Sequence, residues 1–183
     1  MCSRSFGSSV MELADLIESV SDFASRVARR LRAQHSVCSA VHVFIMTSPY
    51  RKQDRQHSPT ATLPLPRPTA DTRVLVNAAV RALRAIYKPG HRYAKAGVML
   101  MELQSGKQEQ ASLDLFDEPE ALQPDGRRDL MATLDALNER FGRDAVGIAS
   151  GARKSARSTQ APKQQRRSPR YTTRLDEVIV AKA

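Results

Sequence analysis

The sequence predicts an α+β fold in which strands and helices follow the order β-α-β-β-α-β over about the first 103 residues. Two segments carry apolar residues at helical spacing, four shorter segments have strand patterns, and proline and glycine mark turns between them. Two such helices can cover only one face of a four-stranded antiparallel sheet. We therefore expect the other face to be open to solvent or to a ligand.

The first three elements are a strand, a helix and a second strand. Residues 2–7 (CSRSFG) alternate as a short strand. Ser9 and Glu12 have the spacing of a capping box, and apolar residues at steps of three and four predict a helix from about residue 10 to residue 34. Residues 39–47 (SAVHVFIMT) predict a strand whose core-facing side chains are Val41, Val43 and Ile45.

The last three elements are a strand, a helix and a strand. Residues 60–65 (TATLPL) predict a strand at a sheet edge, because Pro64 has no ladder donor. Thr69 or Asp71 can cap the second helix, which ends before residues 88–90 (KPG). Residues 91–103 (HRYAKAGVMLMEL) predict the final strand. The side chains expected on the open face are Ser5, His42, Tyr93 and Lys95.

Composition favours a polyanionic partner. The formal net charge is +10 and the pI is near 10.2, as is common in nucleic-acid-binding proteins. The two cysteines lack a CxxC pattern and the four histidines lack metal-ligand spacing, so we expect neither a zinc site nor a cofactor. No apolar run approaches the roughly 20 residues of a membrane span, which predicts a cytoplasmic protein without a membrane partner.

Residues 108–118 (QEQASLDLFDE) place an apolar triplet among polar and acidic residues. Such a triplet is typical of a short linear motif that fills a pocket on a partner, or of a loop pinned to its own domain. A helical pattern follows from Arg127 to Phe141, and residues 150–167 have the composition of a disordered basic tail. We divide the chain into a folded domain (1–104), a linker with the apolar motif (105–125), and a helix with a basic tail (126–183).

Six blocks together resemble the C-terminal part of a Y-family translesion DNA polymerase of the UmuC type. They are SRSFG (3–7), VHVFIMTSPYR (41–51), ATLPLPRPTADTR (61–73), RALRAIYKPGHRYAKAGVML (81–100), LDLFDE (113–118) and SPRYTTR (168–174). The resemblance implies a little finger domain whose open sheet face lies on the DNA backbone near the template–primer junction. Cations and hydroxyls suit that contact. Our candidates for it are Arg4, Ser5, Arg51, Lys52, Arg55, Arg92 and Lys95.

The resemblance also implies a motif that binds the sliding clamp. The longer form of this motif, Gln-x-x-Leu-x-Leu, is met by Gln110, Leu113 and Leu115, and Phe116 follows. In the five-residue form, Ser112 occupies the position of the glutamine. The register therefore stays open between the two forms.

The family's catalytic palm, with its two-metal carboxylates, lies N-terminal to the SRSFG block, which stands at the start of this sequence. The resemblance thus implies no polymerase activity for this chain, and a role in SOS mutagenesis and DNA repair with DNA, the sliding clamp and a UmuD-type accessory protein as partners. An RNA-binding module of the RRM type has the same element order along the chain. It is the weaker alternative, because residues 95–100 (KAGVML) lack its stacking aromatics.

Overall fold

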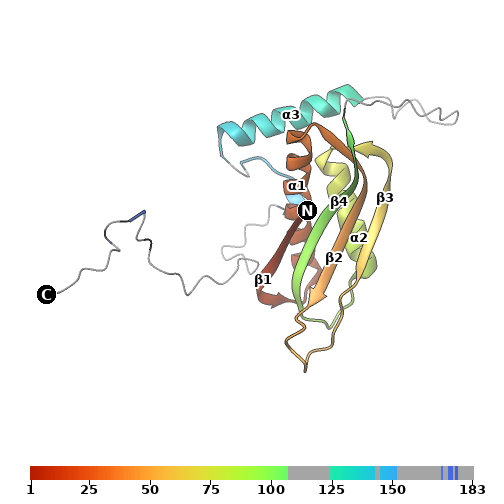
Figure 1. Ribbon diagram of the computed structural model, residues 1–183, viewed down its shortest axis with the longest axis vertical. Helices are drawn as coiled ribbons and strands as arrows, with labels where there is room; N and C mark the ends of the chain where they lie inside the picture. Colours follow the sequence, from red (N-terminus) through yellow and green to blue (C-terminus); the bar gives the residue numbers. More distant parts are fainter. Residues whose placement is uncertain (107–123, 143–144, 152–169, 171–172, 175, 177–183) are drawn as a thin grey trace.

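The computed structural model describes residues 1–106, 124–142, 145–151, 170, 173–174 and 176 (Figure 1). The elements are β1 (Cys2–Val10), α1 (Leu13–Ala33), β2 (Ser36–Thr47), β3 (Thr60–Thr69), α2 (Thr72–Ile86), β4 (Tyr93–Ser105) and α3 (Pro124–Arg140), followed by a short 3-10 turn (Ala149–Gly151). The predicted order β-α-β-β-α-β and the additional helix are confirmed. None of the helices in these ranges has an apolar stretch long enough to cross a membrane.

The sheet has the order β1-β4-β2-β3, and every neighbouring pair is antiparallel. Helices α1 and α2 lie side by side on one face of this sheet (Figure 1). Strand β3 is at an edge, as Pro64 predicts, and β4 and β2 are central. The other face carries no helix from the described ranges, so the predicted open face is present.

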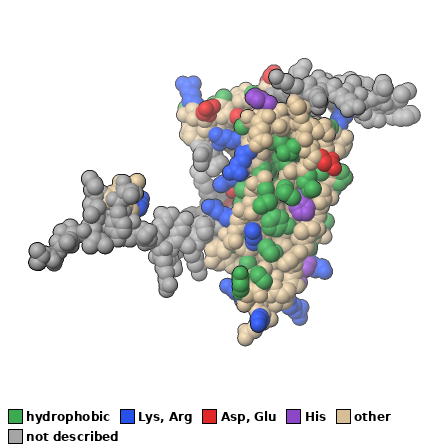
Figure 2. Space-filling view, viewed as in Figure 1, with side chains coloured by type: hydrophobic (Ala, Val, Ile, Leu, Met, Phe, Trp, Pro, Cys, Tyr) green, Lys and Arg blue, Asp and Glu red, His purple; other side chains and the backbone are tan. Residues whose placement is uncertain are grey.

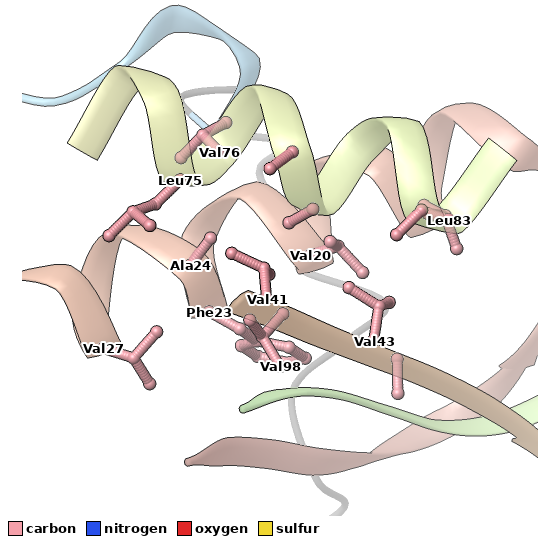
Figure 3. Packing of buried hydrophobic residues seen from close by; sticks show 14 of the residues in the cluster. Val20, Phe23, Ala24, Val27, Val41, Val43, Leu75, Val76, Leu83 and Val98 are labelled. Carbon is pink, nitrogen blue, oxygen red and sulfur yellow. The ribbon is translucent and has the colours of Figure 1, made fainter. Parts of the chain in front are cut away.

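The core lies between the sheet and the two helices. Val41, Val43 and Ile45 of β2 are fully buried, which confirms the predicted direction of this strand. Figure 3 shows Val41, Val43 and Val98 from the sheet facing the apolar sides of both helices. The α1 contribution is Val20, Phe23, Ala24 and Val27, and the α2 contribution includes Leu75, Val76 and Leu83. Burial of such side chains contributes about 1.5–3 kcal/mol each.

One helix start differs from its prediction and one agrees. The Ser9–Glu12 capping box was wrong, because β1 continues through Ser9 to Val10, which is buried opposite Tyr93. Glu12 is the N-cap residue of α1, and its side chain makes no capping hydrogen bond. In contrast, Asp71 caps α2 by accepting a 2.8 Å hydrogen bond from the Arg73 amide at Oδ1. Of the two caps left open by the sequence, the structure selects Asp71.

Tyr93 was wrongly predicted to lie on the open face. The register shifts between Met46, which pairs with Lys95, and Thr47, which pairs with Tyr93. One extra residue on β4 therefore turns Tyr93 to the side of the buried Thr47, whereas Lys95 stays on the open face. The Tyr93 side chain is fully buried.

Helix α3 is fixed to the helix layer by a bidentate ion pair. Arg32 of α1 donates to Asp135 of α3 from Nε at 2.6 Å and from Nη2 at 2.8 Å. The remaining Arg32 nitrogen, Nη1, reaches the Ala70 carbonyl at 2.9 Å and the Thr72 hydroxyl at 2.7 Å. The Asn138 side chain binds the backbone of Val146 in both directions, accepting from its amide and donating to its carbonyl. Thus α3 contacts α1 through the Arg32–Asp135 ion pair, and Asn138 holds the segment after α3 to α3.

Candidate nucleic-acid interface

The open face is built from four cross-strand rows. Residues that are directly opposite in an antiparallel ladder share a face of the sheet. The rows, read from the pairing of the strands, are Ser5–Lys95–Met46, Ser3–Gly97–Phe44–Thr60, Met99–His42–Thr62 and Met101–Ala40–Pro64. Figure 2 shows hydrophobic side chains along the middle of this face and Lys and Arg side chains at its lower end. The face thus combines an apolar centre with hydroxyls on both edge strands.

Phe44 occupies the centre of the open face because β4 has a glycine opposite it. A Cβ atom on Gly97 would come within 2.5 Å of the Phe44 ring and within 2.7 Å of the Ser3 Cβ. The ring therefore lies across the β4 backbone. The Lys95 ammonium is 5.8 Å from the ring centroid, within the range of a cation–π contact. This arrangement holds a cation over an apolar surface.

Most of the candidate cations lie at one end of the sheet, in the segments 48–59 and 87–92. We call this the basic loop end, and its cations are Arg51, Lys52, Arg55 and Arg92. Asp54 lies between two of them, 3.8 Å from Arg51 and 3.9 Å from Arg92. Arg51 also donates to the Ser9 hydroxyl at 2.9 Å. Lys52 and Arg55 are exposed and make no ion pair with the described part of the chain, so they are available to an anionic ligand.

The β2–β3 segment keeps its shape through one glutamine. The Gln56 amide nitrogen lies within hydrogen-bond distance of the carbonyls of Ser48, Arg51 and Asp54. Its carbonyl oxygen accepts from the Thr47 hydroxyl at 2.8 Å. The backbone that carries Arg51, Lys52 and Arg55 is therefore ordered by internal hydrogen bonds before any ligand binds.

A buried tyrosine joins the two segments of the basic loop end. The Tyr93 hydroxyl donates to the Lys88 carbonyl and accepts from the Lys88 amide, both at 3.1 Å. His57 Nδ1 lies 3.0 Å from the same hydroxyl, and it can donate to this oxygen in the tautomer that carries the proton on Nδ1. Burial, together with the nearby His91 and Lys88, lowers the pKa of His57 below its ordinary value. Burial likewise raises the pKa of Tyr93.

The seven candidate DNA contacts fall into three groups. Ser5 and Lys95 lie on the open face, and four cations form the basic loop end. Arg4 is exposed but pairs with the fully buried Ala96, so its position on β1 belongs to the helix-covered face. The clamp-motif residues Gln110, Leu113, Leu115 and Phe116 lie outside the described residues.

Phe44 is an aromatic residue of the open face that sequence reasoning missed. The strict alternation of β2 was the available signal, because Val43 and Ile45 were assigned to the core. Among the described residues, no group of three or more His, Cys, Asp or Glu side chains could hold a metal ion. The open face and the basic loop end together present cations, hydroxyls and an apolar centre.

The sequence of this chain matches a known protein family. Residues 1–113 match the impB/mucB/samB family C-terminal domain, and the chain belongs to this family. Residues 128–181 match a domain of unknown function (DUF4113). The boundary between the two matched regions falls among residues 114–127, before most of α3.

The curated relatives confirm the resemblance of this chain to the C-terminal part of a UmuC-type protein. The chain is 38% identical to Protein UmuC of Salmonella typhimurium over 184 residues, which cover all of this chain and 42% of that protein. It is 40% identical to Protein MucB of Escherichia coli, over 98% of this chain and 40% of that protein. Protein SamB of Salmonella typhimurium is 39% identical over all of this chain and 41% of its own length. The chain thus spans about two fifths of the relatives it matches.

Proposed function

We propose that this chain is the DNA-holding and clamp-tethering part of a UmuC-type translesion polymerase, acting in SOS mutagenesis in the cytoplasm. The observation that carries the proposal is an uncovered sheet face that ends at a preordered group of exposed cations. Cations and hydroxyls without base-reading geometry suit the sugar–phosphate backbone of damaged or primer–template DNA. A UmuD-type accessory protein is a further partner under this proposal.

The basic loop end supplies the ionic part of the proposed DNA contact. Each neutralised phosphate contributes about −0.9 to the slope of log affinity against log salt for duplex DNA. Removing Lys52 and Arg55 together should therefore weaken primer–template binding and make the slope shallower by roughly 1.8. Fluorescence anisotropy of labelled primer–template at several salt concentrations measures both quantities.

Arg81 and Arg84 provide the matched control. Both are exposed on α2, in the helix layer, so the double substitution Arg81→Ala, Arg84→Ala removes the same charge from the covered side of the sheet. We expect it to leave the slope nearly unchanged. Equal losses of affinity in the two double variants would show that DNA binding depends on the net charge of the chain rather than on the basic loop end.

The clamp tether rests on Leu113, Leu115 and Phe116, with Gln110 in the longer form of the motif. Joining a weak DNA contact to a weak clamp contact raises overall affinity through effective concentration. The double substitution Leu115→Ala, Phe116→Ala should abolish binding of the purified chain to the sliding clamp. Leu130→Ala, which truncates an exposed leucine on α3, is the control. Retention of clamp binding by the double variant would overturn this part of the proposal.

The proposal assigns no phosphoryl transfer to these residues. Primer extension with magnesium and nucleotides tests this, and template-dependent extension by the purified chain would refute it. The RNA-binding alternative stays a prediction, and competition between single-stranded RNA and primer–template DNA tests it. Phe44 is the aromatic side chain of the open-face rows, and stacking of an unpaired base on it would make single-stranded RNA an effective competitor of primer–template DNA.

A further inference from the structure

A cavity of about 80 Å³ lies between α1, the start of α2, α3 and the segment that follows α3. Its polar walls include Arg26, Arg29, Arg32, Thr72, Asp135 and Asn138. Leu134, Val146 and Ile148 supply the apolar part of the lining. The cavity exists because α3 docks on α1, since half of these walls come from α3 and the segment after it.

One arginine at the cavity has no partner in the described part of the chain. The Arg32 guanidinium is held by Asp135, and Arg26 forms an ion pair with Asp22 at 2.9 Å. Arg29, between them in sequence and half-buried, makes no hydrogen bond or ion pair with the described residues. Its guanidinium is therefore left for an external anion at a partly apolar site.

The size and the donors define the class of anion. Liquid water takes about 30 Å³ per molecule, so a cavity of about 80 Å³ has room for a group the size of two or three waters. Two donors at the cavity have no acceptor in the described part of the chain: the Arg29 guanidinium of α1, and the Thr72 hydroxyl of α2, which accepts from Arg32 but still has its own proton to donate. A tetrahedral oxyanion can accept from donors on different sides at once, whereas the acceptor sites of a carboxylate lie in one plane. We propose that this cavity binds a phosphate group, either as free phosphate or as one phosphate of a nucleic-acid strand.

This site is separate from the proposed DNA surface. It lies in the helix layer, at the C-terminal half of α1, from which the chain passes into the start of β2. The basic loop end follows the other end of β2, and 12 residues of strand span roughly 40 Å. The cavity is lined by residues of α1 and by Thr72 of α2, which belong to the region matched by the impB/mucB/samB model. Its other walls are residues of α3 and residues 146–148, which belong to the region of unknown function. The proposal thus gives that second region a role: it completes a phosphate site.

Titration of the ¹⁵N-labelled 183-residue chain with inorganic phosphate at constant ionic strength tests the proposal. Saturable shifts of the Arg29 Nε–Hε resonance are expected, with shifts also at the Asn138 side-chain amide. In Arg29→Gln the remaining Asn138 shifts should need on the order of tenfold or more phosphate, because a charge-assisted hydrogen bond contributes about 1.5–3 kcal/mol. Arg81→Gln, which removes an exposed arginine of α2 outside the cavity, should titrate like the unchanged chain.

Addition of a short DNA duplex and of a single strand separates the two sources of phosphate. If either strand form saturates the Arg29 shift and Arg29→Gln weakens that response, a nucleic-acid phosphate occupies the cavity. If inorganic phosphate saturates the shift and DNA leaves it unchanged, free phosphate is the ligand. Non-saturating shifts, or equal affinities in the unchanged chain and Arg29→Gln, would overturn the proposal. Unchanged methyl resonances of Val43 and Leu83 verify that each variant is folded.

Discussion

The Phe44 ring occupies the space that a side chain on Gly97 would need, 2.5 Å from the position of the missing Cβ. The glycine is required for close approach of the ring to the backbone of β4. Because Ser3 is 2.7 Å from the same position, neighbours on both sides close the space. The centre of the open face therefore depends on one residue without a side chain.

Gly97→Ala should destabilise the domain by about 1–3 kcal/mol, the usual cost of overpacking. The same substitution in a Phe44→Ala background should lower the free energy of unfolding by less. The part of the destabilisation that remains would come from the contact with Ser3. Urea denaturation of the four proteins of this double-mutant cycle measures the coupling. An equal cost of Gly97→Ala in both backgrounds would mean that the ring does not oppose the new methyl group.

Asp135→Ala should release α3 from the helix layer. The substitution leaves Arg32, whose side chain is 14% exposed, without its bidentate acceptor. The expected cost is about 1.5–3 kcal/mol, as for a hydrogen bond to a charged group. Hydrogen exchange of the α3 amides should accelerate while exchange in β2 and β4 changes little. Glu139→Ala, at an exposed position of the same helix, is the control.

His57 should stay neutral at lower pH in the folded chain than in the unfolded chain, because burial is the main cause that lowers its pKa below 6.5. Between these two pKa values the unfolded state binds more protons, so stability falls as pH decreases through this window. Above pH 6.5 the titration of His57 should not change the free energy of unfolding. An NMR titration of the His57 ring checks the direction, and a pKa above 6.5 would contradict it.

Cys38 should resist alkylation in the folded state. Burial raises the pKa of its thiol to about 11, so very little reactive thiolate is present near pH 8. Cys2 is only half-buried and should react. Counting labelled cysteines by mass spectrometry should give one label in buffer and two in denaturant. Two labels in buffer would indicate that β2 opens readily near Cys38.

The sequence predicts most of the fold because its signals are local. Core-facing Val41, Val43 and Ile45 follow from alternation along one strand, and Pro64 indicates an edge from its own chemistry. The face of Tyr93 could not be predicted, because the bulge that turns it inward depends on the pairing of β4 with β2. The capping box failed for a similar reason, since Val10 gains burial by extending β1.

The sites follow the same rule. Lys52 and Arg55 are recognisable as loop cations from sequence, whereas Arg32 and Asp135 meet across 103 residues. No local pattern relates two such residues, and the Arg29 cavity depends on their contact. Sequence reasoning therefore predicts a surface whose residues lie in one segment, such as the loop cations Lys52 and Arg55. It does not predict a site whose residues come from two distant segments, such as the Arg29 cavity.

The prolines of β3 limit how other chains can attach. Pro64, Pro66 and Pro68 have no backbone N–H, and the pairing of β3 with β2 is irregular between Pro64 and Thr69. A further strand beside this part of β3 would find no donor at the three prolines and could not form a regular ladder there. Copies of the domain are thereby kept from joining into a continuous sheet through β3.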